Sequence, residues 1–154
     1  MLITLDLLSA YFQLRVAPED WHLLTFLLPT GKYQFKKLPM GWTESQDHLN
    51  QNIQCLLVNI PTIQAMMDDF LLTARGLNDA YEKCLQLLIN AVMSGWVFSR
   101  KKMKVSTSVD FCGLTLQATR EGAVLVTPTK DRLKALVDFP SPTTKKRSNH
   151  LSVY

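Results

Sequence analysis

Cysteine is scarce in this sequence and never occurs in the pairs that build metal sites. The 154 residues include three cysteines, none in a C-x-x-C pair, and three histidines without ligand spacing to them or to each other. This pattern argues against a zinc site. Because the cysteines stand inside apolar stretches, we expect them to be reduced core residues. They are Cys55, Cys84 and Cys112.

Long apolar segments are also missing. No run reaches the length needed to cross a bilayer. The first apolar stretch is interrupted early by Asp6 and is not preceded by a basic leader, which is not the pattern of a signal peptide. From this we expect an intracellular protein, cytoplasmic or nuclear, without a membrane partner.

The chain has only a small excess of charge of one sign. Lys and Arg total 17 against 13 Asp and Glu, for a formal net charge of +4. This balance permits a polyanionic partner but does not require one. With 47% hydrophobic and 19% charged residues, the composition is that of one globular domain with a core.

Three aspartates stand where apolar runs end. Asp68-Asp69 separates the run from Thr62 to Met67 from the run Phe70 to Thr73, and Asp6 ends another run that starts at Leu2. Two strands joined by an acidic turn form a hairpin. If the Asp6 strand is its neighbour, the carboxylates can share a divalent metal site. A solvated turn is the alternative interpretation of an Asp-Asp pair.

Strand geometry restricts which aspartate of the pair faces Asp6. Successive side chains of a strand point to opposite faces, so only one of the two can do so in a regular strand. We expect Asp68 to face Asp6 and Asp69 to play an auxiliary part.

The remaining patterns predict two further hairpins and three helices. The hairpins span 23–38, with one buried and one wet face, and 109–126. A capping box of Thr43 and Gln46 predicts a helix ending near Pro61, and Thr127-Pro128 predicts a short helix. A long helix should run from Asn78 to Gly95, with a core stripe formed by Tyr81, Leu85, Leu88 and Val92.

These elements predict an α+β fold in which helices cover one face of a mixed or antiparallel sheet. In this order they resemble the ferredoxin-like palm of reverse transcriptases, particularly those of gypsy-type long-terminal-repeat retrotransposons. The resemblance runs from about Leu2 to Pro140. It rests on seven ordered stretches of the sequence besides Thr25-Phe26: Thr4-Leu5-Asp6-Leu7 with Tyr11, Val16 to Asp20, Gly31 to Phe35, Leu38 to Gly41, Met67-Asp68-Asp69, Ser99 to Lys102, and Phe111-Cys112-Gly113.

The resemblance implies a metal-dependent catalytic centre. Asp6 and Asp68 match the residues that bind two Mg²⁺ ions, with Mn²⁺ as an alternative, and Asp69 matches a supporting carboxylate. Hard oxygen ligands of this kind suit magnesium. Lys102 matches a lysine near the leaving pyrophosphate, a proton donor or charge stabiliser. The alternative is a solvated basic strand that touches phosphates.

The resemblance also implies substrate contacts. Tyr11 matches the aromatic residue beneath the incoming sugar, although a core tyrosine is the alternative, and Met40-Gly41 matches the loop against the nucleotide. The primer contacts are Met67, Phe111 and Gly113. The implied partners are an RNA or DNA template, a DNA primer and deoxynucleoside triphosphates.

The resemblance also sets the expected domain limits and functions. We expect residues 1–139 to be a palm without fingers, thumb or ribonuclease H domain, and residues 140–154 to be a disordered or frame-shifted tail. The surface exposed by the missing parts would favour association. The first functional hypothesis is an RNA-directed DNA polymerase. The alternatives are an inert truncated retroelement remnant that binds nucleic acid or protein, and an unrelated ferredoxin-like binding module.

Overall fold

The computed structural model describes residues 1–139, so the predicted tail at 140–154 lies outside the described residues. The first half of the chain contains β1 (Leu2–Asp6), α1 (Ala10–Gln13), the 3₁₀ helix η1 (Pro18–Leu24), β2 (Thr25–Leu28), β3 (Gly31–Gln34), α2 (Ser45–Ile53) and the 3₁₀ helix η2 (Gln54–Leu57). The second half contains β4 (Ile63–Met66), β5 (Asp69–Thr73), α3 (Leu77–Ser94), β6 (Lys104–Ser106), β7 (Ser108–Phe111), β8 (Leu114–Ala118), β9 (Val124–Pro128) and α4 (Lys130–Val137).

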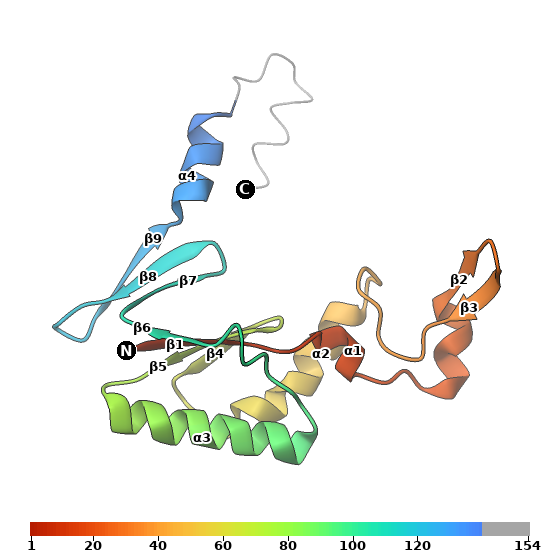
Figure 1. Cartoon of the computed structure of the whole chain (residues 1–154), viewed down its shortest axis with the longest axis horizontal. Coiled ribbons are helices and arrows are strands. Elements are labelled where there is room, and N and C mark those ends of the chain that lie inside the picture. The colour runs from red at the N-terminus through yellow and green to blue at the C-terminus, as the bar shows by residue number, and fades with distance from the viewer. Residues whose placement is uncertain (140–154) are drawn as a thin grey trace.

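A four-stranded sheet forms the centre of the fold. Its strand order is β4-β5-β1-β6, and β1 pairs antiparallel with both β5 and β6. The predicted hairpin around Asp68-Asp69 is therefore confirmed, and the strand that carries Asp6 is its direct neighbour. Figure 1 shows α2 and α3 together on one side of this sheet, which confirms the α+β class.

The helix-covered face of the sheet holds the main hydrophobic core. Ile3 and Leu5 of β1 and Phe70 and Leu72 of β5 are at most 2% exposed. They belong to one buried cluster with residues of both helices, including Leu49, Ile53, Leu87 and Ala91. Because side chains alternate along a strand, the even-numbered residues of β1 must face the other side.

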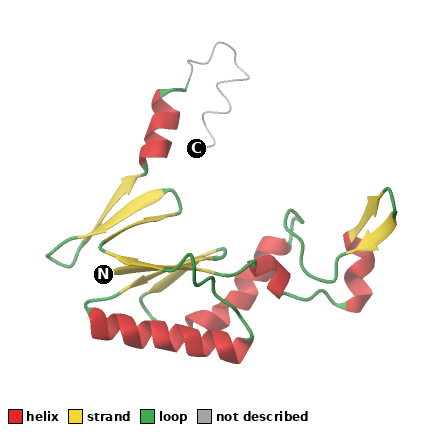
Figure 2. Cartoon of the chain, in the orientation of Figure 1, coloured by secondary structure: helices red, strands yellow, loops and turns green. Residues whose placement is uncertain are grey.

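That other side is covered by a second sheet. Strands β7, β8 and β9 form a three-stranded antiparallel sheet, drawn on the opposite side of the central sheet from the helices in Figure 2. Leu2 and Leu71 pack with Val109 and Leu116 in a smaller buried cluster. The hairpin predicted at 109–126 is confirmed around its turn at 120–122, which joins β8 to β9, but its first strand, predicted at 109–116, is wrong because a turn at 112–113 divides it into β7 and β8.

The prediction of which face of α3 is buried is wrong. Tyr81 and Val92 are 68% and 78% exposed, and Leu85 and Leu88 are 43% and 44% exposed. The helix buries Ala80, Leu87 and Ala91 instead. Both stripes are apolar, but the small alanines let the helix lie close against the sheet.

Two local predictions near the N-terminal half also differ from the structure. The hairpin at 23–38 forms as β2 and β3, but every residue of β3 is exposed rather than alternating. The two strands form a sheet of their own (Figure 1), so no layer buries either face.

The capping box predicted at Thr43 is absent. Instead, α2 begins at Ser45, whose hydroxyl donates to the Pro39 carbonyl at 2.7 Å.

The cysteines are also less buried than expected. Cys55 and Cys112 are exposed and Cys84 is partly buried, and all three are free thiols. Cys55 lies on η2 and Cys112 lies in the β7–β8 turn, and apolar neighbours in sequence do not produce burial at either position. Within residues 1–139, no helix combines the length and hydropathy of a membrane-spanning segment.

Candidate active site

The first and third aspartates of the acidic constellation lie on neighbouring strands. The register of β1 and β5 places Asp6 opposite Asp69 and Thr4 opposite Leu71. Directly opposed residues of an antiparallel pair point to the same face. Asp6 and Asp69 therefore project toward the side covered by β7–β9, away from the helices.

Asp68 occupies the turn between β4 and β5. Its carbonyl accepts a hydrogen bond from the Leu7 amide at 3.0 Å, which ties the turn to the end of β1. Met67, just before it, has a left-handed backbone with φ of 57°. We expected Asp68 to stand opposite Asp6, but the turn takes up positions 67 and 68, so β5 begins at Asp69 and places that residue in register.

Lys102 lies at the same end of β1. Its Nζ donates to Asp6 Oδ2 at 2.9 Å, across 96 positions of the chain. The amide of Ser99 donates to the Asp6 carbonyl at 2.7 Å and holds the intervening loop in place. The hydrogen bond and charge of Asp6 raise the pKa of Lys102 above its ordinary value, so the ammonium form is maintained.

The Asp69 carboxyl carries the clearest electrostatic signature of the cluster. Its pKa is raised by partial burial, and then by the negative charges of Asp68 and Asp6. The charge of Lys102 acts in the opposite direction. Asp69 is thus close enough to Asp6 and Asp68 to be repelled by both, with Lys102 as a cationic neighbour.

The donor set fits a hard divalent cation. The carboxylates of Asp6, Asp68 and Asp69 offer oxygen atoms only, and the repulsion that Asp6 and Asp68 exert on Asp69 is of the kind that a divalent cation relieves. Among the described residues, no group of three or more Asp, Glu, His or Cys side chains is arranged to hold a metal ion. The cation beside Asp6 is the Lys102 ammonium.

Two of the three predicted primer residues, Phe111 and Gly113, lie at the β7–β8 turn, whereas Met67 lies in the turn between β4 and β5. Phe111 packs partly buried on the smaller core cluster. Cys112 and Gly113 both have left-handed backbones, with φ of 51° and 75°. Burial and the charge of Asp69 raise the pKa of the Cys112 thiol, whereas Arg132 lowers it. The turn therefore lies within electrostatic range of the acidic cluster.

The predicted nucleotide residues lie on two other segments. Tyr11 is on α1, five positions after the end of β1, and packs partly buried against the main core. Met40 is 62% exposed, and Gly41 has φ of 86° in the loop before α2. The Tyr11 and Met40 side chains therefore differ in exposure: Tyr11 is partly buried, whereas Met40 is exposed to solvent.

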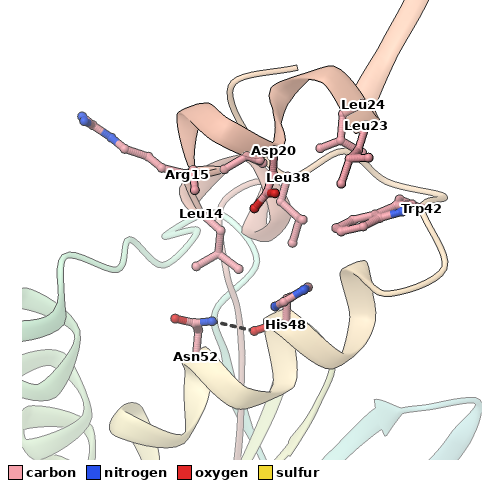
Figure 3. Close-up of a pocket in the computed structure, with 11 residues that line it drawn as sticks. Leu14, Arg15, Asp20, Leu23, Leu24, Leu38, Trp42, His48 and Asn52 are labelled. Carbon is pink, nitrogen blue, oxygen red and sulfur yellow. Dashed lines mark hydrogen bonds between the residues drawn. The ribbon is translucent and has the colours of Figure 1, made fainter. Parts of the chain in front are cut away.

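A cavity of about 260 Å³ lies beside the Met40-Gly41 loop, between η1 and α2. Figure 3 shows Leu23 and Leu24 on its η1 side and His48 on α2, with the Trp42 ring close to His48. The two rings stack with centroids 5.8 Å apart. The sequence patterns did not single out this cavity, because its walls come from three separate segments of the chain, 14–24, 38–42 and 48–52.

Comparison with known proteins supports the fold and identifies the family. Solved structures of the foamy viral protease-reverse transcriptase are similar, one in complex with double-stranded DNA and one with an RNA/DNA hybrid. Their TM-scores are 0.83 and 0.76 at 20% identity, over 97% of this chain and 26% and 20% of theirs. The expected palm architecture is thereby confirmed.

Sequence relatives come from viral and transposon polyproteins. The Pro-Pol polyprotein of feline foamy virus is 29% identical over 146 residues, which are 94% of this chain and 12% of that protein. The enzymatic polyprotein of Cestrum yellow leaf curling virus is 32% identical over 130 residues, 77% of this chain and 19% of that protein. The Tf2-3 transposon polyprotein of Schizosaccharomyces pombe is 23% identical over 145 residues, 92% of this chain and 10% of that protein.

The chain thus spans less than a fifth of the length of these relatives. Residues 1–116 match the sequence family described as reverse transcriptase (RNA-dependent DNA polymerase). This match covers both segments that carry the aspartates. The chain therefore belongs to the reverse transcriptase family.

Proposed function

We propose that this domain forms the catalytic palm of an RNA-directed DNA polymerase and transfers nucleotides to a primer 3′-hydroxyl with two bound Mg²⁺ ions. Asp6 and Asp68 are the proposed ligands, and Asp69 supports them. The observation that carries the proposal is the placement of Asp6 opposite Asp69, with the Asp68 turn hydrogen-bonded to the end of β1. Mn²⁺ is an alternative metal with the same ligand preference.

When bound, divalent ions would stabilise the attacking and leaving oxygens of an in-line displacement. The chain's own residues have separate tasks. Asp6, almost fully buried, gives the site a fixed ligand. Lys102 holds an ammonium beside it, and once released from Asp6 it can stabilise charge on, or give a proton to, the leaving pyrophosphate.

The substrates proposed here follow from the family and from the neighbouring structures. Those proteins are named as complexes with double-stranded DNA and with an RNA/DNA hybrid. We propose an RNA or DNA template with a DNA primer, and deoxynucleoside triphosphates, as the substrates of this domain. Tyr11, Met40 and Gly41 would lie on the nucleotide side, and Met67, Phe111 and Gly113 on the primer side. A gypsy-type parent element stays a prediction.

An inert remnant is the second candidate function. It is favoured by the many large apolar side chains that remain exposed, such as Leu27 at 73% and Met93 at 82%. Surfaces of this kind promote association. The third hypothesis, an unrelated binding module, is excluded because the chain belongs to the reverse transcriptase family.

Primer extension by the purified chain tests the proposal. An RNA template with an annealed DNA primer is incubated with Mg²⁺ and deoxynucleoside triphosphates, and Asp68→Asn is the matched variant. We expect extension by the wild type and a loss of at least about 100-fold in the variant, the scale for removing a charge-stabilising catalytic group. Equal product from both proteins would support the inert remnant.

A further inference from the structure

Arg132 lies against Gly113 in the β7–β8 turn, and none of the predicted roles uses it. It belongs to the first turns of α4, which begins two residues after β9 ends. The Thr129 amide donates to the Gly113 carbonyl at 3.2 Å and fixes the start of α4 on the β7–β8 turn. Figure 1 shows α4 continuing directly from β9 beside that turn.

The guanidinium of Arg132 occupies the place that a side chain at Gly113 would fill. A Cβ on Gly113 would stand 2.7 Å from Arg132 Nε and 2.8 Å from Cζ. Real Cβ atoms do not approach other atoms so closely. The absence of a side chain at Gly113 therefore leaves room for the Arg132 guanidinium. It also permits the positive φ of 75°.

This cation has no acidic partner within the described part of the chain. Ion pairs there join Lys83 to Asp79 and Lys102 to Asp6. Arg132 also lies near Cys112, because its charge lowers the pKa of that thiol, which the charge of Asp69 raises. An exposed, planar guanidinium without a carboxylate is suited to bind a phosphate through two parallel hydrogen bonds.

We propose that Arg132, packed against Gly113, is a primer-positioning residue that binds a backbone phosphate near the primer 3′ end. The proposal rests on the proposed function, since it places the primer on the β7–β8 turn. Lys130, two positions earlier on the same helix and exposed, is the matched control for general positive charge.

Binding of a labelled primer–template duplex at several salt concentrations tests the contact. Arg132→Ala should weaken binding roughly 3- to 10-fold and lower the slope of log K against log salt by about one, the effect of one lost phosphate contact. Lys130→Ala should change both values less. Equal losses in the two variants would overturn the proposal, because general charge would then explain them.

A neutral primer identifies the phosphate. Methylphosphonate linkages at the last two primer positions should weaken wild-type binding about as much as Arg132→Ala does. Combined with Arg132→Ala, they should cause little further loss, because both changes remove the same contact. Fully additive losses would overturn the assignment to the primer end.

The position of Arg132 beside Gly113 can be tested without nucleic acid and without catalysis. Arg132→Ala should slow alkylation of Cys112 by iodoacetamide, measured by mass spectrometry, because less of the thiol is then ionised. Cys55, also exposed, serves as the internal control and should react at an unchanged rate. An unchanged alkylation rate of Cys112 would overturn the proposed position of Arg132 beside the turn.

These outcomes are separable from failure of the proposed function. A chain that binds the duplex through Arg132 but extends no primer contradicts the proposed catalysis and supports the Arg132 contact. A wild-type chain that binds no duplex contradicts the contact itself.

Discussion

Asp6 and Asp69 stand directly opposite each other on the antiparallel strands β1 and β5. This relationship places two carboxylates on the face of the central sheet that lies under β7–β9. The Asp68 turn and Lys102 complete the group at the same end of β1. The negative charges of Asp6 and Asp68 repel that of Asp69, and the charge of Lys102 only partly offsets this repulsion.

That repulsion predicts a pH-dependent effect of Asp69→Asn. The folded-state pKa of Asp69 is raised above its ordinary value of 3.8, so the ionised form costs stability in the folded protein. The cost is present above the raised pKa and disappears as the pH falls below about 3.8. Without divalent metal, the variant should therefore be more stable at pH 7, by about 0.5 kcal/mol or less because solvent screens the site.

Thermal unfolding in a metal-free buffer measures this difference, which corresponds to a rise of about 1–2 °C. The advantage of the variant should vanish near pH 3.5. Asp47→Asn, an exposed acid on α2, is the control and should bring no such gain. A lower melting temperature for Asp69→Asn at pH 7 would contradict the proposed repulsion.

Lys102 should compete with metal at Asp6. Its Nζ takes a position 2.9 Å from Asp6 Oδ2, so Lys102→Met should tighten Mn²⁺ binding by roughly two- to fivefold, the scale of one exposed ion pair. The same variant should slow primer extension, because the cation beside the leaving group is lost. The neighbouring Lys101→Met is the control. Weaker Mn²⁺ binding in Lys102→Met would show that the lysine assists the metal site instead.

The buried face of α3 is testable with two adjacent leucines. Leu87 is 0% exposed and Leu88 is 44% exposed. Leu87→Ala should lower the free energy of unfolding by about 3 kcal/mol through lost burial and a cavity. Leu88→Ala should cost well under half of that. Urea denaturation measures both values, and a larger loss at Leu88 would restore the helix face expected from the sequence.

The helix α3 shows where sequence patterns lose their power. Its limits were predicted well, since Gly95 takes the left-handed φ of 76° expected at a helix end. The buried face of the helix could not be predicted, because Tyr81 and Leu88 give as strong an apolar stripe as Leu87 and Ala91. The choice depends on how closely the helix approaches the sheet, which is a property of the tertiary structure.

The site divides in the same way. Strand ends and hairpins were predictable from apolar runs, and these bring Asp6 and the Asp68-Asp69 pair to one end of the sheet. The register was not predictable, because it depends on how many residues the turn consumes. Arg132 was missed for a related reason: its position on Gly113 follows from the path of β9, and sequence spacing does not reveal it.

Titration with Mn²⁺, followed by the loss of the free-ion signal in electron paramagnetic resonance, tests the central claim most directly. In the presence of a primer–template, the wild-type chain should bind Mn²⁺ at two sites that Mg²⁺ competes for. Asp6→Asn should weaken binding at least about tenfold, whereas Glu82→Gln on the exposed side of α3 should not change it. Equal Mn²⁺ binding by the wild type and Asp6→Asn would contradict a metal centre at these aspartates.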